Sequence, residues 1–207
     1  MVHPDASLTV KAPVNVSNQK INQFLNDKAK WIKEKIAHYQ GIQAEKEKII
    51  SLQNVEILGE PFEIEYAKIK QPEILMHSVI LPSECKFDQE KRKECLKKAL
   101  KTKAKKLLPE ILSEIGTKIS LCPAGVKIIQ AKEKWGSCDE NKIVKLNFYL
   151  IQLPLHLIQY VIVHELVHLK YLDHSKQFWS EVERFLPDYK ERRNCLKDYA
   201  YLLQALN

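Results

Sequence analysis

Hydrophobic positions recur at helical spacing over several long stretches of the chain. Ser17 is placed to cap a helix whose apolar residues share one face through the segment WIKEKIAHYQ. Asp88 is placed to cap another helix that runs to about Gly116, and Pro109 is predicted to kink or split it. A third helix is expected to begin at Pro154 or Leu155 and to end near Tyr171 or Leu172, and Ser175 is placed to cap the next one.

Shorter alternating segments predict strands between these helices. The segment VEILGEPFEIEY is typical of a hairpin that turns at Gly59-Glu60, and EILMHSVILP forms either a second pair or one longer strand. We expect further strands at 7–14, 126–131 and 142–150, the last two paired across the segment WGSCDEN.

Composition and charge narrow the class of protein. The 207 residues include five cysteines, an odd number without a C-x-x-C pair, which is typical of a reducing compartment. The N-terminal segment lacks the pattern of a signal peptide, and the longest apolar stretch, Ile158 to Leu169, is too short and too polar to span a bilayer. We therefore expect a cytoplasmic protein without a membrane partner.

Two histidines four residues apart lie on the same face of a helix, one turn apart. In the segment VHELVH these are His164 and His168, and two imidazoles at this spacing can bind one zinc ion. Glu165 lies beside the ion, where its carboxylate reaches the attacking water and can act as a general base. The pattern predicts a metal-dependent hydrolase.

A catalytic zinc usually has three protein ligands and one open position. His174 follows His164 by ten residues, which is the spacing of the long zincin motif with three histidines. That motif usually has glycine at the turn, where this chain has Tyr171. Asp173 and Glu181 remain alternative third ligands, because other zincins use a glutamate from a following helix.

The same residues could instead be core side chains with satisfied hydrogen-bond partners. Apolar residues flank the motif on both sides. Burying two imidazoles and a carboxylate among them without partners costs several kcal/mol. A bound metal removes that cost, so the pattern favours the metal site.

Several motifs along the chain carry a family resemblance. They are Ala12-Pro13 with Trp31-Ile32, Trp135-Gly136-Ser137-Cys138, His164-Glu165-Leu166-Val167-His168, Asp173-His174-Ser175, Phe178-Trp179 and Leu186-Pro187-Asp188-Tyr189 with Lys190-Glu191-Arg192-Arg193. Together they resemble the YgjP-like metallopeptidase family over nearly the whole chain. One departure is Lys134, where the family often has arginine; the substitution keeps a positive charge and loses a bidentate contact.

The resemblance implies an α+β fold: a zincin-like metal domain (86–207) with a small mixed β-sheet, preceded by a β-containing N-terminal part (1–85) and long helices. It implies zinc, or another divalent transition metal, bound by His164, His168 and His174, with Glu165 as the catalytic acid and base. The family is also similar to SprT-type proteases, which act on proteins attached to DNA.

The segment before the predicted strand at 142–150 is a candidate substrate-binding wall. An edge strand beside a zincin site holds extended substrate by main-chain hydrogen bonds, and Gly136 would let a backbone approach closely. Ser137 or Lys134 could stabilise the developing oxyanion. A packed Trp135 in a structural turn is an equally weighted alternative. Cys138 is expected to be neither a nucleophile nor a fourth ligand, since a fourth ligand would close the site.

A basic stretch raises the question of an acidic partner. The formal net charge is +7, and residues 91–106 contain nine lysines and arginines. Such a helix could face nucleic acid or a phosphate-bearing ligand, although no aromatic residues interleave and a solvated face is the commoner explanation.

Three functions remain open from the sequence. The favoured one is a zinc metallopeptidase acting on a peptide or protein. The second is a metal-dependent hydrolase of phosphoanhydrides such as nucleoside triphosphates, although the chain has no G-x-x-x-x-G-K loop. The third is a DNA-associated binding module with structural zinc, against which Glu165 argues because a structural site needs no base.

Overall fold

The computed structural model describes residues 1–3, 6–13, 15–51 and 54–205. The chain separates into two compact units, Met1–Lys48 and Ile49–Asn207. The predicted boundary after residue 85 lies inside the second unit. The reason is a shared core: Val55 and Val79, before that boundary, belong to the same buried cluster as Leu96 and Leu100 after it.

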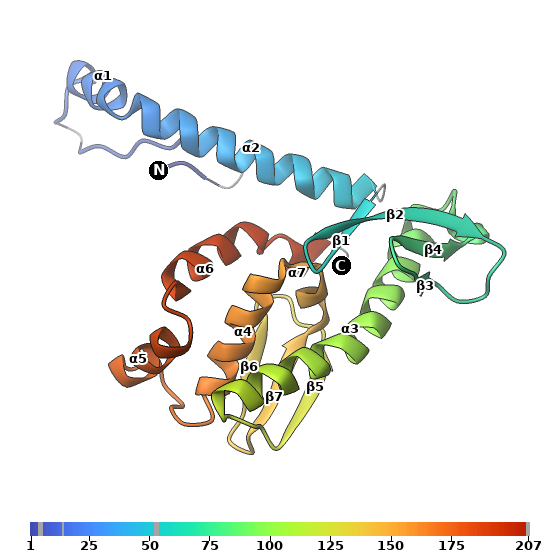
Figure 1. Cartoon of the computed structure of the whole chain (residues 1–207). Coiled ribbons are helices and arrows are strands. Elements are labelled where there is room, and N and C mark those ends of the chain that lie inside the picture. The colour runs from blue at the N-terminus through green and yellow to red at the C-terminus, as the bar shows by residue number, and fades with distance from the viewer. Residues whose placement is uncertain (4–5, 14, 52–53, 206–207) are drawn as a thin grey trace. The chain divides into compact units, whose positions relative to one another are not determined.

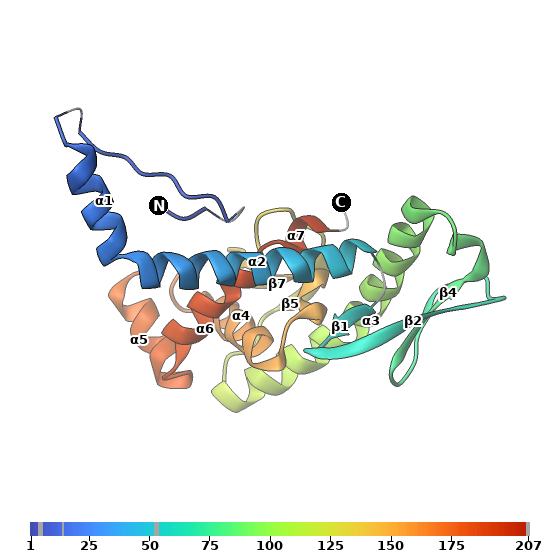
Figure 2. The same cartoon turned by 90° about the horizontal axis from the view of Figure 1, so that it is seen from above.

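The first unit is helical. Its helices are α1 (Asn18–Asp27) and α2 (Ala29–Ser51). Helix α2 continues past Lys48 and is one uninterrupted helix in both views (Figures 1 and 2). The predicted cap is confirmed, because the Lys20 amide donates to Ser17 Oγ at 3.4 Å. The strand predicted at 7–14 is wrong for its described residues, of which only Leu8 takes part in an isolated bridge, with Val2. Val14 lies outside the described residues.

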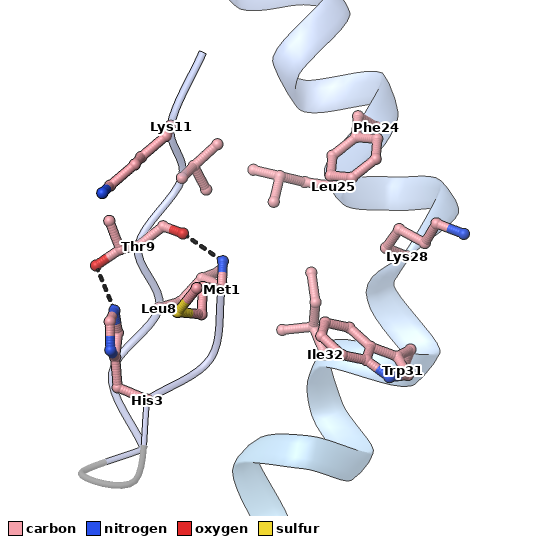
Figure 3. A pocket seen from close by; sticks show the side chains of 11 residues that line it. Met1, His3, Leu8, Thr9, Lys11, Phe24, Leu25, Lys28, Trp31 and Ile32 are labelled. Carbon is pink, nitrogen blue, oxygen red and sulfur yellow. Dashed lines mark hydrogen bonds between the residues drawn. The ribbon is translucent and has the colours of Figure 1, made fainter. Parts of the chain in front are cut away.

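A groove of about 640 Å³ lies within this unit, between the N-terminal segment and the two helices (Figure 3). Apolar side chains dominate its walls, and two lysines stand at its rim: the lining includes Leu8, Val10, Phe24, Leu25, Trp31 and Ile32 with Lys11 and Lys28. Phe24 and Trp31 are 57% and 50% exposed. The unit therefore presents a largely open apolar surface.

The second unit begins with a four-stranded sheet in the order β1-β2-β4-β3, built from β1 (Asn54–Ile57), β2 (Glu60–Ala67), β3 (Glu73–Ile74) and β4 (Ser78–Pro82). The predicted hairpin is confirmed as the antiparallel pair β1 and β2. Its turn lies one residue earlier than predicted, at Leu58 and Gly59, which have φ of 56° and 85°. The segment 73–82 forms the second pair rather than one longer strand, since β3 and β4 are antiparallel neighbours. A 3₁₀ turn, η1 (Ser83–Cys85), follows.

Helix α3 (Gln89–Ile119) is continuous through Pro109, so the predicted split is wrong. Its cap at Asp88 is confirmed by a 3.1 Å bond from the Lys91 amide to Asp88 Oδ1. Leu108 and Leu112 are buried on either side of the proline. Their packing holds the helix together where proline removes one backbone hydrogen bond.

The second sheet has the order β5-β7-β6 and is formed by β5 (Gly125–Ile129), β6 (Gly136–Cys138) and β7 (Ile143–Asn147). The predicted pairing of the two longer strands is confirmed, and β5 and β7 are parallel. The short β6 joins the other side of β7 in antiparallel direction. The strand predicted over 142–150 is shorter, because its last residues belong to the 3₁₀ segment η2 (Phe148–Gln152).

Helices α4 (Leu155–Val167), α5 (Lys176–Phe185), α6 (Tyr189–Leu196) and α7 (Leu202–Ala205), with η3 (Lys197–Tyr199), complete the unit. In Figure 1, α4 lies beside the small sheet, and it contacts β6, α3, α5 and α6. The α+β class with a small mixed sheet is confirmed. Within the described ranges, no helix combines the length and apolarity needed to cross a membrane.

Candidate metal centre

The helix α4 lies deep in the core of the second unit. Residues on all its sides are buried, among them Leu157, Ile158, Val161, Ile162 and Leu166. Its start agrees with the prediction, with Pro154 in the capping position. Because this helix is surrounded by packed side chains, the backbone from which the site residues extend is held in a fixed position.

The predicted end of this helix is wrong, because α4 stops at Val167 and His168 is its C-terminal cap residue. Tight backbone bonds follow: the amides of Lys170 and Tyr171 both donate to the Val167 carbonyl, at 3.0 and 3.1 Å. The turn reverses the chain within a few residues. It thereby returns the next segment, which carries His174, to the face of α4 that holds the other two histidines.

Three imidazoles converge at this point. His164, His168 and His174 each offer a ring nitrogen, and these nitrogens all lie within 4.8 Å of one another. The Nε2 atoms of His164 and His174 are 3.0 Å apart. The spacing of ten residues between the first and third histidine is thus matched by proximity in space.

The two alternative third ligands have other partners. An Asp173 carboxylate oxygen accepts from the Ser175 amide at 3.3 Å. Glu181 forms ion pairs with Lys170 and Arg184, at 2.8 and 3.0 Å. The structure brings neither carboxylate into the histidine cluster.

The turn after α4 orients His168. Nδ1 of His168 lies 2.9 Å from the Tyr171 carbonyl oxygen, and a carbonyl can only accept, so Nδ1 carries the hydrogen and donates. Nε2 is then left with its lone pair for a metal. Tyr171 is not among the non-glycine residues with positive φ, so glycine is not required at this turn.

The donor set fits a divalent transition metal. Burial lowers the pKa of His164 to about 3, with further lowering from His168, His174 and Arg193, and burial also lowers the pKa of His168. A neutral imidazole is the form that binds a metal. Nitrogens bound tetrahedrally to one zinc ion lie about 3.3 Å apart, close to the spacing found for His164 and His174.

His164 carries a further sign of an incomplete environment. Its Nδ1 atom is buried and has no hydrogen-bond partner among the described residues. Buried polar atoms without partners are rare in folded proteins. The other ring nitrogen of His164, Nε2, is the one that faces His174.

Glu165 lies next to this cluster and is only 5% exposed. Burial raises the pKa of its carboxyl to about 8, and the positive charge of Lys134 lowers it in part. A carboxylate with a pKa near the working pH can both take and return a proton. Glu165 lines the same cleft as the three histidines, which places its carboxyl within reach of a molecule bound there.

A cleft of about 270 Å³ opens over these residues. Its walls come from β6, α4 and the loop after α4: Gly136, Ser137, Cys138, His164, Glu165, His168, Leu172 and His174. A Cβ atom at Gly136 would lie 2.8 Å from Glu165 Oε1 and 2.9 Å from its Cγ. Only glycine leaves room for the Glu165 side chain at this position.

The four residues predicted to bind substrate divide into two groups. Gly136 and Ser137 line the cleft. Lys134 is exposed and acts on Glu165 through its charge, while Trp135 is half-buried and packs against the core. Contact of any of them with substrate stays a prediction.

Asn147, at the end of β7, is a site residue that sequence reasoning missed. Its buried side-chain amide donates to the carbonyls of Ala131 and Lys134, at 2.7 and 2.9 Å, and its backbone amide donates to Trp135 at 2.8 Å. Asn147 therefore holds the loop that leads into β6. The signal available in the sequence was the polar Asn147 at the end of the predicted strand KIVKLN.

Aromatic residues of α5 pack against the cluster, and Phe178 is fully buried. Its ring centroid lies 4.6 to 4.9 Å from those of all three histidines. Trp179 is half-buried, and its ring stacks on His174 and on Tyr189, at 5.6 and 5.4 Å. The exposed ring of His174 is therefore the outer member of a stack of three rings, with Trp179 and Tyr189 beneath it.

Two other predicted features lie outside the metal cluster. Burial, and secondarily the charge of Glu165, raise the pKa of the Cys138 thiol, which disfavours a thiolate ligand. The basic stretch 91–106 lies on α3, where Lys93 and Lys97 pair with Glu90 and Glu94 of the same helix, at 2.8 and 3.4 Å. Neither the structure nor the comparisons below support a nucleic-acid or phosphate ligand for it.

Comparisons with solved structures and with curated proteins give limited similarity. Two crystal structures show partial similarity, both of metallopeptidase zymogens. Abylysin of Pyrococcus abyssi is 24% identical with a TM-score of 0.40, covering 44% of this chain and 91% of that one. Jannalysin of Methanocaldococcus jannaschii is 24% identical with a TM-score of 0.41, covering 45% of this chain and 97% of that one. No curated protein matches.

The decisive comparison is with protein families. The model of the YgjP-like metallopeptidase domain matches residues 1–199, which is nearly the whole chain and includes every residue of the histidine cluster. The chain belongs to the YgjP-like metallopeptidase family and is a metal-dependent peptidase.

Proposed function

We propose that the protein is a zinc peptidase in which His164, His168 and His174 bind the ion and Glu165 is the general base. One observation carries the proposal: three imidazole nitrogens lie within 4.8 Å of one another beside a buried carboxylate. Membership of a metallopeptidase family supports it. A bound zinc ion would supply a Lewis acid that polarises water and the scissile carbonyl.

The chain's own groups then handle the proton. Glu165 takes it from the attacking water and later gives it to the leaving amine. Glu165, buried beside the cluster, holds the proton between these two steps. Gly136 leaves space for the Glu165 side chain to reach the cleft, so the base and the three histidines face the same volume.

Substrate is proposed to bind along β6. This strand pairs with β7 on one side and is an edge of the three-stranded sheet. An extended peptide can add to such an edge through main-chain hydrogen bonds, with little demand on its sequence. Lys134, Trp135, Gly136 and Ser137 are the residues of this wall, and the positive charge of Lys134 lies close enough to affect Glu165.

The test compares peptide with phosphoanhydride hydrolysis in the zinc-loaded full chain. Unfolded casein-like protein and nucleoside triphosphates are incubated with the enzyme, with and without a chelator. We expect chelator-sensitive peptide cleavage that Glu165→Gln abolishes. Glu181→Gln is the matched control, because Glu181 is ion-paired with Lys170 and Arg184 away from the cluster.

Two results would contradict the proposal. If the Glu165→Gln variant still cleaves peptide, Glu165 is not the general base. If the enzyme hydrolyses nucleoside triphosphates in a chelator-sensitive reaction but does not cleave peptide, its substrate is a phosphoanhydride and not a peptide. For a DNA-binding module, salt-steep DNA affinity that is lost on neutralising residues 91–106 would be required.

A further inference from the structure

Two cysteines that sequence spacing does not pair lie side by side in the structure. Cys85 is the last residue of η1, and Cys95 lies in the second turn of α3. Their Sγ atoms are 2.8 Å apart, and both cysteines are free thiols. Among the described residues, no other pair of thiols lies within hydrogen-bond distance.

The segment between the two thiols is held by several local bonds. The Asp88 amide donates to the Cys85 carbonyl at 3.4 Å, and Asp88 caps α3 through the Lys91 amide. An Arg92 guanidinium nitrogen donates to the Lys86 carbonyl. These bonds keep the start of α3 close to η1, so the two thiols are neighbours by local structure rather than by chance contact.

The distance is suited to bond formation. A disulfide requires an S–S separation of about 2.05 Å, so the sulfur atoms need to approach by only about 0.8 Å. Cys95 is half-buried and reachable from solvent, whereas Cys85 is 4% exposed.

We propose that Cys85 and Cys95 form a dithiol site that small-molecule disulfides, such as oxidised glutathione, convert to an intramolecular disulfide. The Cys95 thiolate attacks one sulfur of oxidised glutathione, forming a mixed disulfide and releasing one glutathione thiolate. The Cys85 thiolate then attacks the Cys95 sulfur and releases the second glutathione. The protein loses two electrons and two protons, and oxidised glutathione gains them as two thiols.

The environment of Cys95 sets the speed of this exchange. Burial raises the pKa of Cys95 to about 11, with further raising from the contact with Cys85 and from Glu84, and partial lowering from Lys98. Thiolate is therefore scarce at neutral pH, so the exchange is slow there and accelerates as pH rises.

The test follows thiols in the full-length chain. The reduced protein is incubated with oxidised glutathione at pH 8.5, quenched with acid, and its thiols are counted after denaturation. We expect the thiols of Cys85 and Cys95 to be lost from the total of five without bound glutathione at either residue, and a non-reduced proteolytic fragment that links the two. Closing this loop of about 11 residues should raise the Tm by about 5–10 °C, and a reductant should reverse the rise.

Three variants make the result decisive. Cys122→Ser, which removes an exposed cysteine, should leave both the linkage and the shift unchanged. Cys85→Ser and, separately, Cys95→Ser should abolish the shift. Retention of all five thiols, glutathione adducts without closure, or a linkage to another cysteine would each overturn the proposal. None of these readouts depends on peptidase activity.

Discussion

The metal centre is built from two parts of very different character. His164 and Glu165 stand on α4, a helix surrounded by core, and Glu165 is 5% exposed. His174 stands on the loop between α4 and α5 and is exposed. The helix supplies fixed positions and the burial that alters pKa values, whereas the loop supplies the last ligand, positioned by the turn at Tyr171 and by Trp179. The comparison shows a division of roles: the buried helix fixes the positions and pKa values of the site residues, and the exposed loop adds the third histidine.

The largest expected effect comes from the helix. Glu165→Gln keeps the shape of the side chain and removes the base, so kcat should fall by about 10²- to 10⁴-fold. Zinc content, measured on the same preparation, should stay at the wild-type level because Glu165 is not a ligand in the proposal. A large loss of zinc together with activity would show that Glu165 acts through the metal site instead.

The second prediction compares ligands from the two parts. His174→Ala should weaken zinc binding by at least about 10- to 100-fold, the range for losing a partner that merely orients a ligand, and His164→Ala should weaken it more. The reason is that His164 sits in the buried part of the site, where water replaces an imidazole poorly. Competition with a chromogenic chelator measures both affinities. Equal zinc affinity in wild type and His174→Ala would mean that the loop residue His174 is not a ligand.

The third prediction concerns the wall opposite the helix. Gly136→Ala places a methyl group 2.8 Å from Glu165 Oε1 and displaces the carboxylate. We expect kcat to fall by about 10- to 100-fold, comparable with the effect of a misplaced catalytic group. Ser137→Ala, on the same strand but without that contact, is the control and should have a smaller effect. A fully active Gly136→Ala enzyme would be incompatible with the position described for Glu165.

The fourth prediction uses pH and the metal-free protein. The folded pKa of Glu165, about 8, lies above its ordinary 4.5, so the folded state binds more protons between these values and stability falls as pH rises through them. His164 acts oppositely: its lowered pKa, about 3, makes stability fall as pH drops below 6.5. His164 is common to wild type and Glu165→Gln, so its effect cancels in their difference.

That difference is the measurable quantity. The unfolding free energy of Glu165→Gln minus that of wild type should increase from pH 5 to pH 8, by up to a few kcal/mol, in urea titrations with chelator present. A difference independent of pH would mean that Glu165 ionises normally in the folded protein. Zinc-loaded samples are excluded because metal binding changes both titrations.

The smallest expected effect is on the other candidate ligands. Asp173→Asn and Glu181→Gln should leave zinc affinity within about twofold of wild type, because loss of a surface ion pair or a loop contact is worth little. Asp173 accepts from Ser175, and Glu181 pairs with Lys170 and Arg184. A loss of affinity comparable with that of His174→Ala would make the carboxylate a ligand.

Local patterns made the helix part of the site predictable. Positions four residues apart lie on one helix face whatever surrounds them, so His164 and His168 could be paired directly from the sequence. The same holds for the caps at Ser17 and Asp88, each confirmed by a backbone amide bonded to its side chain.

Features that depend on distant contacts were not predictable. Apolar residues continue to Leu172, so periodicity extended α4 beyond Val167, where backbone bonds actually close the turn. Asn147 acts through carbonyls of a loop 13 to 16 residues away, and the closeness of Cys85 and Cys95 arises from a turn between two elements. Sequence spacing contains none of these relations.

The ligand set of the bound ion is the central claim, and X-ray absorption at the zinc edge tests it most directly. One equivalent of zinc is added to the metal-free full chain, and spectra are compared between wild type and His174→Ala. The account predicts three imidazole ligands and no sulfur in wild type, and two imidazoles in the variant. A sulfur ligand, or an unchanged imidazole number in the variant, would contradict it.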